Sequence, residues 1–64
     1  MPVIRIEMFE GRTDDQKRAC AKAVTDAWVE ICGGTPQQVH VIFTDIAKSD
    51  WAVAGRLVSD PKPE

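Results

Sequence analysis

The chain has 64 residues, of which eight are basic and ten acidic, and its formal net charge is −2 at pH 7. This length excludes a second domain, and about 40% of the unfolded surface would remain exposed in a folded monomer, so we expect one domain over residues 1–64 that needs partners. The balanced charge provides no basic stripe for nucleic acid or an anionic membrane surface. No apolar run approaches the roughly 20 residues that span a bilayer, and the N-terminus has no signal-peptide pattern, so we expect a cytoplasmic protein.

Two cysteines and one histidine limit the covalent and metal chemistry of the chain. On one helix, Cys20 and Cys32 would be about 18 Å apart along the axis, which is too far for a disulfide. One histidine and two distant thiols make no set of metal ligands, so no metal is expected. Self-association is therefore the expected source of additional stability.

The first half of the chain predicts a strand followed by a helix. Residues 3–9, VIRIEMF, alternate between two faces, as in a strand. Thr13 followed by Gln16 is typical of a capping box, so a helix should begin at about Asp14 and end at residues 33–34, both glycine. An apolar stripe follows helical spacing along it: Cys20, Ala23, Val24, Ala27, Trp28 and Ile31.

The second half predicts another strand and a hairpin. Residues 39–45, VHVIFTD, have apolar side chains on both faces, which is typical of a buried strand. A strand, a helix and a strand predict an α/β (α+β) fold built on a βαβ unit with parallel strands. The segments AVA and RLV around Gly55 predict a short C-terminal β-hairpin, and residues 60–64 predict a polar, frayed end.

A single helix covers only one face of such a sheet. The other face keeps an apolar row, and both outer strand edges keep unpaired backbone groups. We therefore expect subunits to pair edge to edge and then face to face.

Pro2 is the residue with the clearest chemical potential. Removal of Met1 would turn its nitrogen into a secondary amine, whereas an internal proline nitrogen is not basic. An unperturbed α-amino group has a pKa of about 7.7 to 8.0, and desolvation or nearby cations lower it, which leaves neutral amine as a general base near pH 7. The alternative is a proline that only begins a strand.

The segment PVIRIEMFEGRTDDQK resembles the start of the 4-oxalocrotonate tautomerase family, which has an amino-terminal proline and the pattern EGR, Ser or Thr, an acid and QK. The resemblance continues through VHVIFTDIAKSDWAVAG and covers most of the chain. It implies a βαβ unit with a terminal hairpin, assembled as a hexamer that is a trimer of dimers. It also implies a cofactor-independent isomerase that converts 2-hydroxydienoates and enol forms of 2-oxo acids to their keto isomers.

The family's site residues correspond to positions of this chain. Pro2 matches the catalytic proline, which removes a proton from the dienol hydroxyl and returns one to carbon. Arg12 matches the arginine that binds a substrate carboxylate, with a solvated loop arginine as the alternative. Trp51 matches an aromatic wall of the pocket and could equally anchor an interface. Met8 matches an apolar lining position, although packing is the commoner role of a strand methionine.

His40 departs from the family pattern, which has a second arginine here, against the 2-hydroxyl or oxo oxygen and the adjacent carboxylate. Histidine is shorter and, with an unperturbed pKa of about 6.5, only partly cationic at neutral pH. We therefore expect weaker or more pH-dependent binding of a dicarboxylate. The alternative is a polar residue satisfied on its strand.

Two further functions fit the same scaffold. One is hydration or hydrolytic dehalogenation of an unsaturated acid, in which a protonated proline acts as an acid and a carboxylate, which no residue clearly supplies, activates water. The other is a non-catalytic assembly subunit in which Met1 is retained. Loss of about 131 Da from the intact mass favours the isomerase.

Overall fold

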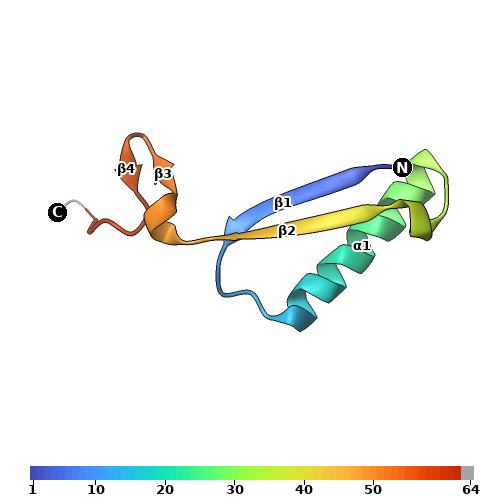
Figure 1. Cartoon of the computed structure of the whole chain (residues 1–64), viewed down its shortest axis with the longest axis horizontal. Helices are drawn as coiled ribbons and strands as arrows, with labels where there is room; N and C mark the ends of the chain where they lie inside the picture. Colours follow the sequence, from blue (N-terminus) through green and yellow to red (C-terminus); the bar gives the residue numbers. More distant parts are fainter. Residues whose placement is uncertain (63–64) are drawn as a thin grey trace.

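The computed structural model describes residues 1–62, which form a two-stranded parallel sheet, one long helix and a small hairpin (Figure 1). The elements in chain order are β1 (Val3–Phe9), α1 (Asp14–Cys32), the 3-10 turn η1 (Pro36–Gln38), β2 (His40–Ile46), the 3-10 turn η2 (Lys48–Asp50), β3 (Ala52–Val53) and β4 (Arg56–Leu57). The predicted βαβ unit and hairpin are confirmed. Residues 63–64 of the expected frayed end lie outside the described residues.

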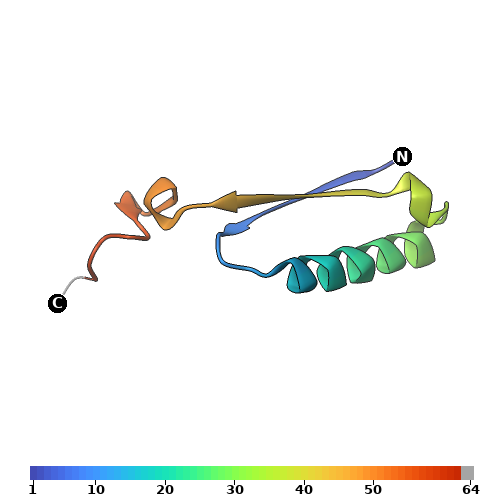
Figure 2. The same ribbon diagram turned by 60° about the horizontal axis from the view of Figure 1, so that its bottom comes forward.

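The sheet pairs β1 with β2 in parallel, from Val3 beside His40 to Phe9 beside Ile46. Helix α1 lies over one face of this sheet, and the other face has no covering element in the described chain (Figure 2). Exposure alternates along β1 as the sequence predicts, because every second side chain points toward the helix. Strand β2 begins one residue later than predicted, since Val39 caps η1 and donates its N–H to the carbonyl of Pro36.

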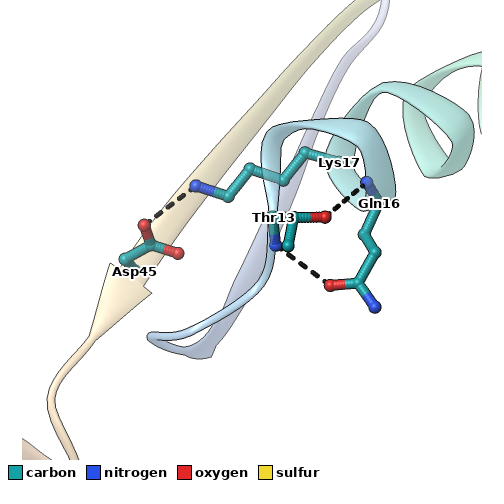
Figure 3. Close-up of polar contacts among 4 residues, drawn as sticks. All are labelled: Thr13, Gln16, Lys17 and Asp45. Atoms are coloured by element: carbon teal, nitrogen blue, oxygen red, sulfur yellow. Dashed lines mark hydrogen bonds and ion pairs between the residues drawn. The ribbon is translucent and has the colours of Figure 1, made fainter.

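Helix α1 begins at the predicted capping box (Figure 3). The backbone N–H of Gln16 donates to Thr13 Oγ1 at 3.1 Å, and the backbone N–H of Thr13 donates to Gln16 Oε1 at 3.0 Å. The helix ends at Gly33, whose φ of 84° is left-handed and whose N–H donates to the carbonyl of Val29 at 2.9 Å. The local signals at both helix ends therefore act as expected.

The predicted apolar stripe of α1 coincides only in part with the face of the helix that packs on the sheet. The half-buried helix positions are Lys17, Ala21, Val24, Thr25 and Val29. Other stripe residues lie toward β1 and line two hollows with its inward side chains, and Ile31 is 81% exposed. The reason is the small width of the sheet. In the described chain β1 has no strand beside its outer edge, so the part of the stripe that extends beyond this edge has no strand to cover it.

The described part of the chain has no fully buried residue and hence no core of its own. It exposes 5161 Å², whereas a compact monomer of this size exposes about 4,100 Å². Its radius of gyration is 15.6 Å, against about 11 Å for a compact chain of this length. The hairpin causes much of this extension, because it lies beyond the end of the sheet (Figure 1). None of the described helices is long and apolar enough to cross a membrane.

The hairpin is closed by a two-residue turn, Ala54 and Gly55. Both residues have positive φ, 53° and 79°, as a turn of type I′ requires between twisted strands. At its base, the N–H of Val58 donates to the carbonyl of Trp51 at 2.8 Å. The small arm is therefore fixed to the segment that carries Trp51.

Candidate active site

Pro2 lies at the start of β1, at the end of the sheet where α1 finishes (Figure 1). Its carbonyl accepts the N–H of His40 at 3.0 Å, so the first residues of the two strands are fixed side by side. Pro2 itself is half-buried. The structure thus brings together two of the residues singled out in the sequence, and removal of Met1 would leave an amine at this position.

An open cavity of about 450 Å³ lies beside Pro2. Its volume is within the range of small-molecule sites. Trp28 and Cys32, one helical turn apart on α1, supply one wall, and the segment from Gly33 to Val39 supplies much of the rest. No charged side chain of the described chain lines it: the lining residues are Met1, Pro2, Trp28, Cys32, Gly33, Gly34, Thr35, Gln38 and Val39.

The turn after α1 holds the far wall of this cavity in place. Gln38 Oε1 accepts the N–H of Thr35 at 3.1 Å. A Cβ at Gly34 would lie 2.8 Å from the same oxygen, and the φ of Gly34 is 90°. The positive φ favours glycine at this position, and a Cβ here would displace the flexible end of the Gln38 side chain, which holds the turn through Thr35.

Arg12 lies at the opposite end of the sheet, in the loop between β1 and α1. It borders a hollow of about 170 Å³ whose lining includes the apolar side chains of Ile6, Met8 and Phe43. Within residues 1–62 no ion pair involves Arg12. A permanent, unpaired guanidinium over an apolar floor is suited to a carboxylate, which it can bind through two hydrogen bonds.

Lys17 borders the same hollow but is already paired. Its Nζ lies 2.9 Å from Asp45 Oδ2, and this contact joins the start of α1 to the end of β2 (Figure 3). The loop that carries Arg12 is therefore held from the helix side. The described residues contain no group of three or more His, Cys, Asp or Glu side chains that could hold a metal ion.

Trp51 packs against Phe9 with the ring centroids 4.5 Å apart and the planes at 61°, an edge-to-face arrangement. The ammonium of Lys48 lies 5.9 Å from the centroid of the Phe9 ring. Phe9 is the last residue of β1, so Trp51 lies near the same end of the sheet as Arg12. Within one chain it is distant from Pro2.

The predicted site residues thus fall into two groups. Pro2 and His40 lie at one end of the sheet, and Met8, Arg12 and Trp51 lie toward the other. The seven-residue strand between the groups is about 23 Å long. Pro2 and Arg12 of one chain are therefore too far apart to hold one small substrate, and a site that uses both needs two copies.

Trp28 belongs to the predicted apolar stripe of the helix, yet both Trp28 and Cys32 line the cavity beside Pro2. Their spacing of four residues places them on one side of the helix, just before the glycines that end it. That spacing is the available signal. Local sequence patterns do not specify how α1 crosses the sheet. They therefore do not show which end of the strands Trp28 and Cys32 face.

Comparison with known proteins places the chain in one family. The family model "Tautomerase enzyme" matches residues 2–61. A probable tautomerase of Ralstonia nicotianae is 47% identical over 60 residues, which are 94% of this chain and 92% of the relative. The 2-hydroxymuconate tautomerase of Bacillus subtilis is 40% identical over 60 residues, which are 94% of this chain and 97% of the relative.

Solved structures show the same fold at similar sequence distance. YwhB, described as a homologue of 4-oxalocrotonate tautomerase, superposes with a TM-score of 0.89 at 38% identity over 95% of this chain and 100% of its own. A 4-oxalocrotonate tautomerase isozyme of Methylibium petroleiphilum gives 0.82 at 37% identity over 89% and 92%. The resemblance seen in the sequence is confirmed: this chain belongs to the tautomerase family and has the 4-oxalocrotonate tautomerase fold.

Proposed function

We propose that the chain is a cofactor-independent isomerase that converts 2-hydroxydienoates, or enol forms of 2-oxo acids, to their keto isomers. The observation that carries this proposal is the position of Pro2, the first residue before β1, beside an uncharged cavity of small-molecule size. Membership of the tautomerase family supports it. The amine is available once Met1 is removed.

The proposed reaction is a proton transfer that needs no oxidant or reductant. The neutral amine of Pro2 takes the proton of the 2-hydroxyl group, and the oxygen electron pair forms the carbonyl. The π electrons move along the chain to the carbon that accepts the proton back from the prolinium. Uncharged walls favour the neutral amine over the charged one, which suits Pro2 to act first as a base.

The same proposal assigns the carboxylate of the substrate to Arg12 of the partner subunit. Two copies would pair their open β1 edges in antiparallel fashion, which sets the start of one β1 beside the end of the other. Pro2 of one copy then lies near Arg12 of the partner subunit. The uncovered apolar stripe of α1 supports this arrangement, because a second helix beside it would bury the exposed Ile31.

We propose a homohexamer in which three such dimers join through the helix-free faces of their sheets. Val3, Phe9 and Ile42 are exposed on that face, and the excess surface of the single chain supports association. A cytoplasmic location is part of the proposal and is supported by the free thiols of Cys20 and Cys32. The hydratase or dehalogenase alternative is less supported, because no carboxylate of the described chain lines the Pro2 cavity.

The test is the initial rate of ketonisation, followed by ultraviolet absorbance, of 2-hydroxymuconate and of the monocarboxylate 2-hydroxypenta-2,4-dienoate. The protein is first shown by intact mass to lack Met1. We expect Pro2→Ala to lower the rate by about 100-fold or more, because a general acid and base is lost. Pro61→Ala, far from the cavity, is the matched control. Parent-like rates in Pro2→Ala, or no ketonisation of either compound by the parent, would overturn the proposal.

A further inference from the structure

We infer, building on the function proposed above, that Lys48 of the partner subunit is a second cation of the site. In a dicarboxylate enol acid it binds, together with His40, the carboxylate next to the 2-hydroxyl group, and Arg12 of the partner subunit keeps the other carboxylate. Three features of the described chain carry the inference: the unpaired charge of Lys48, the aromatic ring over which its ammonium lies, and the charges that set the register of the proposed β1 pair.

No carboxylate of the described chain pairs with Lys48. Lys17 and Lys22 are each committed to an aspartate. Within residues 1–62 no ion pair involves Lys48, which is an exposed residue. A lysine ammonium is a compact charge with three N–H donors. Lys48 therefore offers a positive charge and N–H donors to an incoming carboxylate.

The ammonium of Lys48 is directed toward β1. Lys48 begins η2, and the N–H of Asp50 donates to the carbonyl of Ala47 at 2.8 Å, which closes this turn. Lys48 Nζ lies 5.9 Å from the centroid of the Phe9 ring, and Trp51 packs against the same ring. A contact between an exposed cation and an aromatic face is weak, so the ring positions the ammonium and leaves it able to turn to a carboxylate.

The register of the proposed β1 pair follows from its charges. Arg5 and Glu7 lie on either side of Ile6 at the middle of the strand. An antiparallel pair centred on Ile6 sets Arg5 opposite Glu7 of the partner subunit, and opposite charges across two strands are favourable. The same register sets Val3 opposite Phe9 of the partner subunit, so the ring that positions the ammonium lies beside the start of β1.

The start of β2 lies on the other side of Val3. His40 pairs with Val3 in the sheet, and both side chains lie on the helix-free face. The backbone N–H of His40 also holds the carbonyl of Pro2. Neighbouring strands are about 4.8 Å apart, so the Cα atoms of His40 and Phe9 of the partner subunit lie about 10 Å from each other. A carboxylate between them is within reach of His40 and of Lys48 of the partner subunit, beside Pro2.

This arrangement assigns the two ends of a dicarboxylate. The 2-hydroxyl group must reach the amine of Pro2, and the carboxylate on the neighbouring carbon accompanies it. A lysine keeps its charge at neutral pH, whereas a histidine loses most of its charge there, so Lys48 of the partner subunit supplies the permanent cation. Arg12 of the partner subunit, in the loop after β1, is left for the far carboxylate. Pro2 precedes β1 and Lys48 follows β2, so this place is at the end of the sheet and outside the middle of the face through which the dimers are proposed to join (Figure 1).

Steady-state kinetics with 2-hydroxymuconate test the charge of Lys48. We expect Lys48→Met to raise KM about tenfold and to change kcat by less than about threefold, because a binding contact is lost. Lys48→Arg keeps the cation and should stay within about twofold of the parent. Lys22→Met makes the same chemical change at a lysine side chain of α1 that is 78% exposed, and it should move neither constant. An unchanged KM in Lys48→Met, or an equal rise in Lys48→Arg, would overturn the inference.

A cation moved to the start of β2 tests whether Lys48 and His40 meet the same carboxylate. The double variant Lys48→Met/His40→Arg places a permanent charge on the other side of that group. We expect its KM for 2-hydroxymuconate to return to within about threefold of the parent value. Native mass spectrometry verifies that the variants assemble as the parent does. A KM as high as that of Lys48→Met alone would overturn the inference.

A binding experiment reads the same contact without turnover. The chain has two tryptophans, so Trp28→Phe leaves Trp51, which packs on the Phe9 ring, as the single fluorophore. In this background Lys48→Met should weaken the binding of trans,trans-muconate, a dicarboxylate, about tenfold and that of sorbate, a monocarboxylate, less than about threefold. Equal weakening of both would overturn the inference. Lys48-dependent binding of muconate without turnover of any enol acid would instead overturn the proposed function, so the two failures are distinguishable.

Discussion

Arg12 and Lys17 border one hollow, yet their surroundings give them different roles. Arg12 has no anionic partner within the described chain, whereas Lys17 is committed to Asp45. The side chains of that pair are 26% and 43% exposed, so the pair is only partly screened by water. Lys17 therefore stabilises the frame that carries Arg12, and Arg12 keeps its charge available.

Replacement of Lys17 tests this division at the scale of single residues. We expect Lys17→Ala to lower the free energy of unfolding by about 0.5 to 1 kcal/mol, because a partly exposed ion pair is lost. It should also raise KM for an enol acid with little change in kcat, since the loop of Arg12 loses its support. Urea unfolding at fixed protein concentration and steady-state kinetics measure the two effects.

Lys22→Ala is the matched control. Lys22 pairs with Asp26 on the same helix, but these side chains are 78% and 57% exposed. The hydrogen bond to Asp26, and then its charge, raise the pKa of Lys22. A raised pKa means that any contribution is present at neutral pH and is lost only as the pH rises through the lysine pKa in alkaline solution. A KM change in Lys22→Ala as large as in Lys17→Ala would contradict the role given to Lys17.

The hairpin turn provides a test at the scale of elements. Ala54 has a φ of 53°, and a residue with a Cβ in this left-handed region costs about 1 kcal/mol or more. We therefore expect Ala54→Gly to raise the unfolding midpoint. Ala52→Gly makes the same chemical change on β3, outside the turn, and should lower the midpoint. A lower midpoint in Ala54→Gly would show that the strain is absent or is offset elsewhere.

Elements whose signals are local could be predicted well from the sequence. The Thr13–Gln16 capping box and Gly33 fix the ends of α1 through neighbouring atoms, and both were predicted. The one-residue shift of β2 arises because η1 recruits Val39 as its cap, a detail that a run of β-branched residues conceals. How much of the apolar stripe packs on the sheet also depends on the number of strands beneath the helix, which the sequence of the helix does not show.

The residues of the candidate site could be predicted from the sequence, but their positions relative to one another could not. The motif around Pro2 and Arg12 was evident in the sequence, and the structure puts these residues at opposite ends of β1. Trp51 lies against Phe9, a contact between segments far apart in the chain. Trp28 lines the Pro2 cavity because of how α1 is placed on the sheet. Sequence periodicity does not show this placement, so it assigned Trp28 to helix packing.

At the scale of the whole molecule, the proposed sharing of each site between two copies predicts complementation between inactive chains. Pro2→Ala and Arg12→Ala each remove one half of every site in their own assemblies. In a mixed dimer, one of the two sites regains an intact Pro2 and an intact Arg12. Random pairing of equal amounts through a two-fold interface should therefore restore about a quarter of the parent activity.

The measurement unfolds the two variants together, refolds them and follows the ketonisation rate. Each variant refolded alone is the control and should stay inactive. Exchange of subunits is verified by native mass spectrometry, for which one variant carries a mass tag. Verified exchange without recovered activity would contradict a site divided between copies, and activity in Arg12→Ala alone would remove that arginine from the site.

The exposed edge of β1 also bears on how the chain avoids fibrous aggregation. Arg5 and Glu7 lie on either side of Ile6, at the middle of this edge. Stacking of identical strands in parallel register would place arginine on arginine and glutamate on glutamate, which is unfavourable, whereas an antiparallel pair centred on Ile6 sets each charge opposite its complement. The two charges that favour a closed pair therefore oppose an open-ended cross-β stack, and they would protect a newly made chain from aggregation while its β1 edge is unpaired.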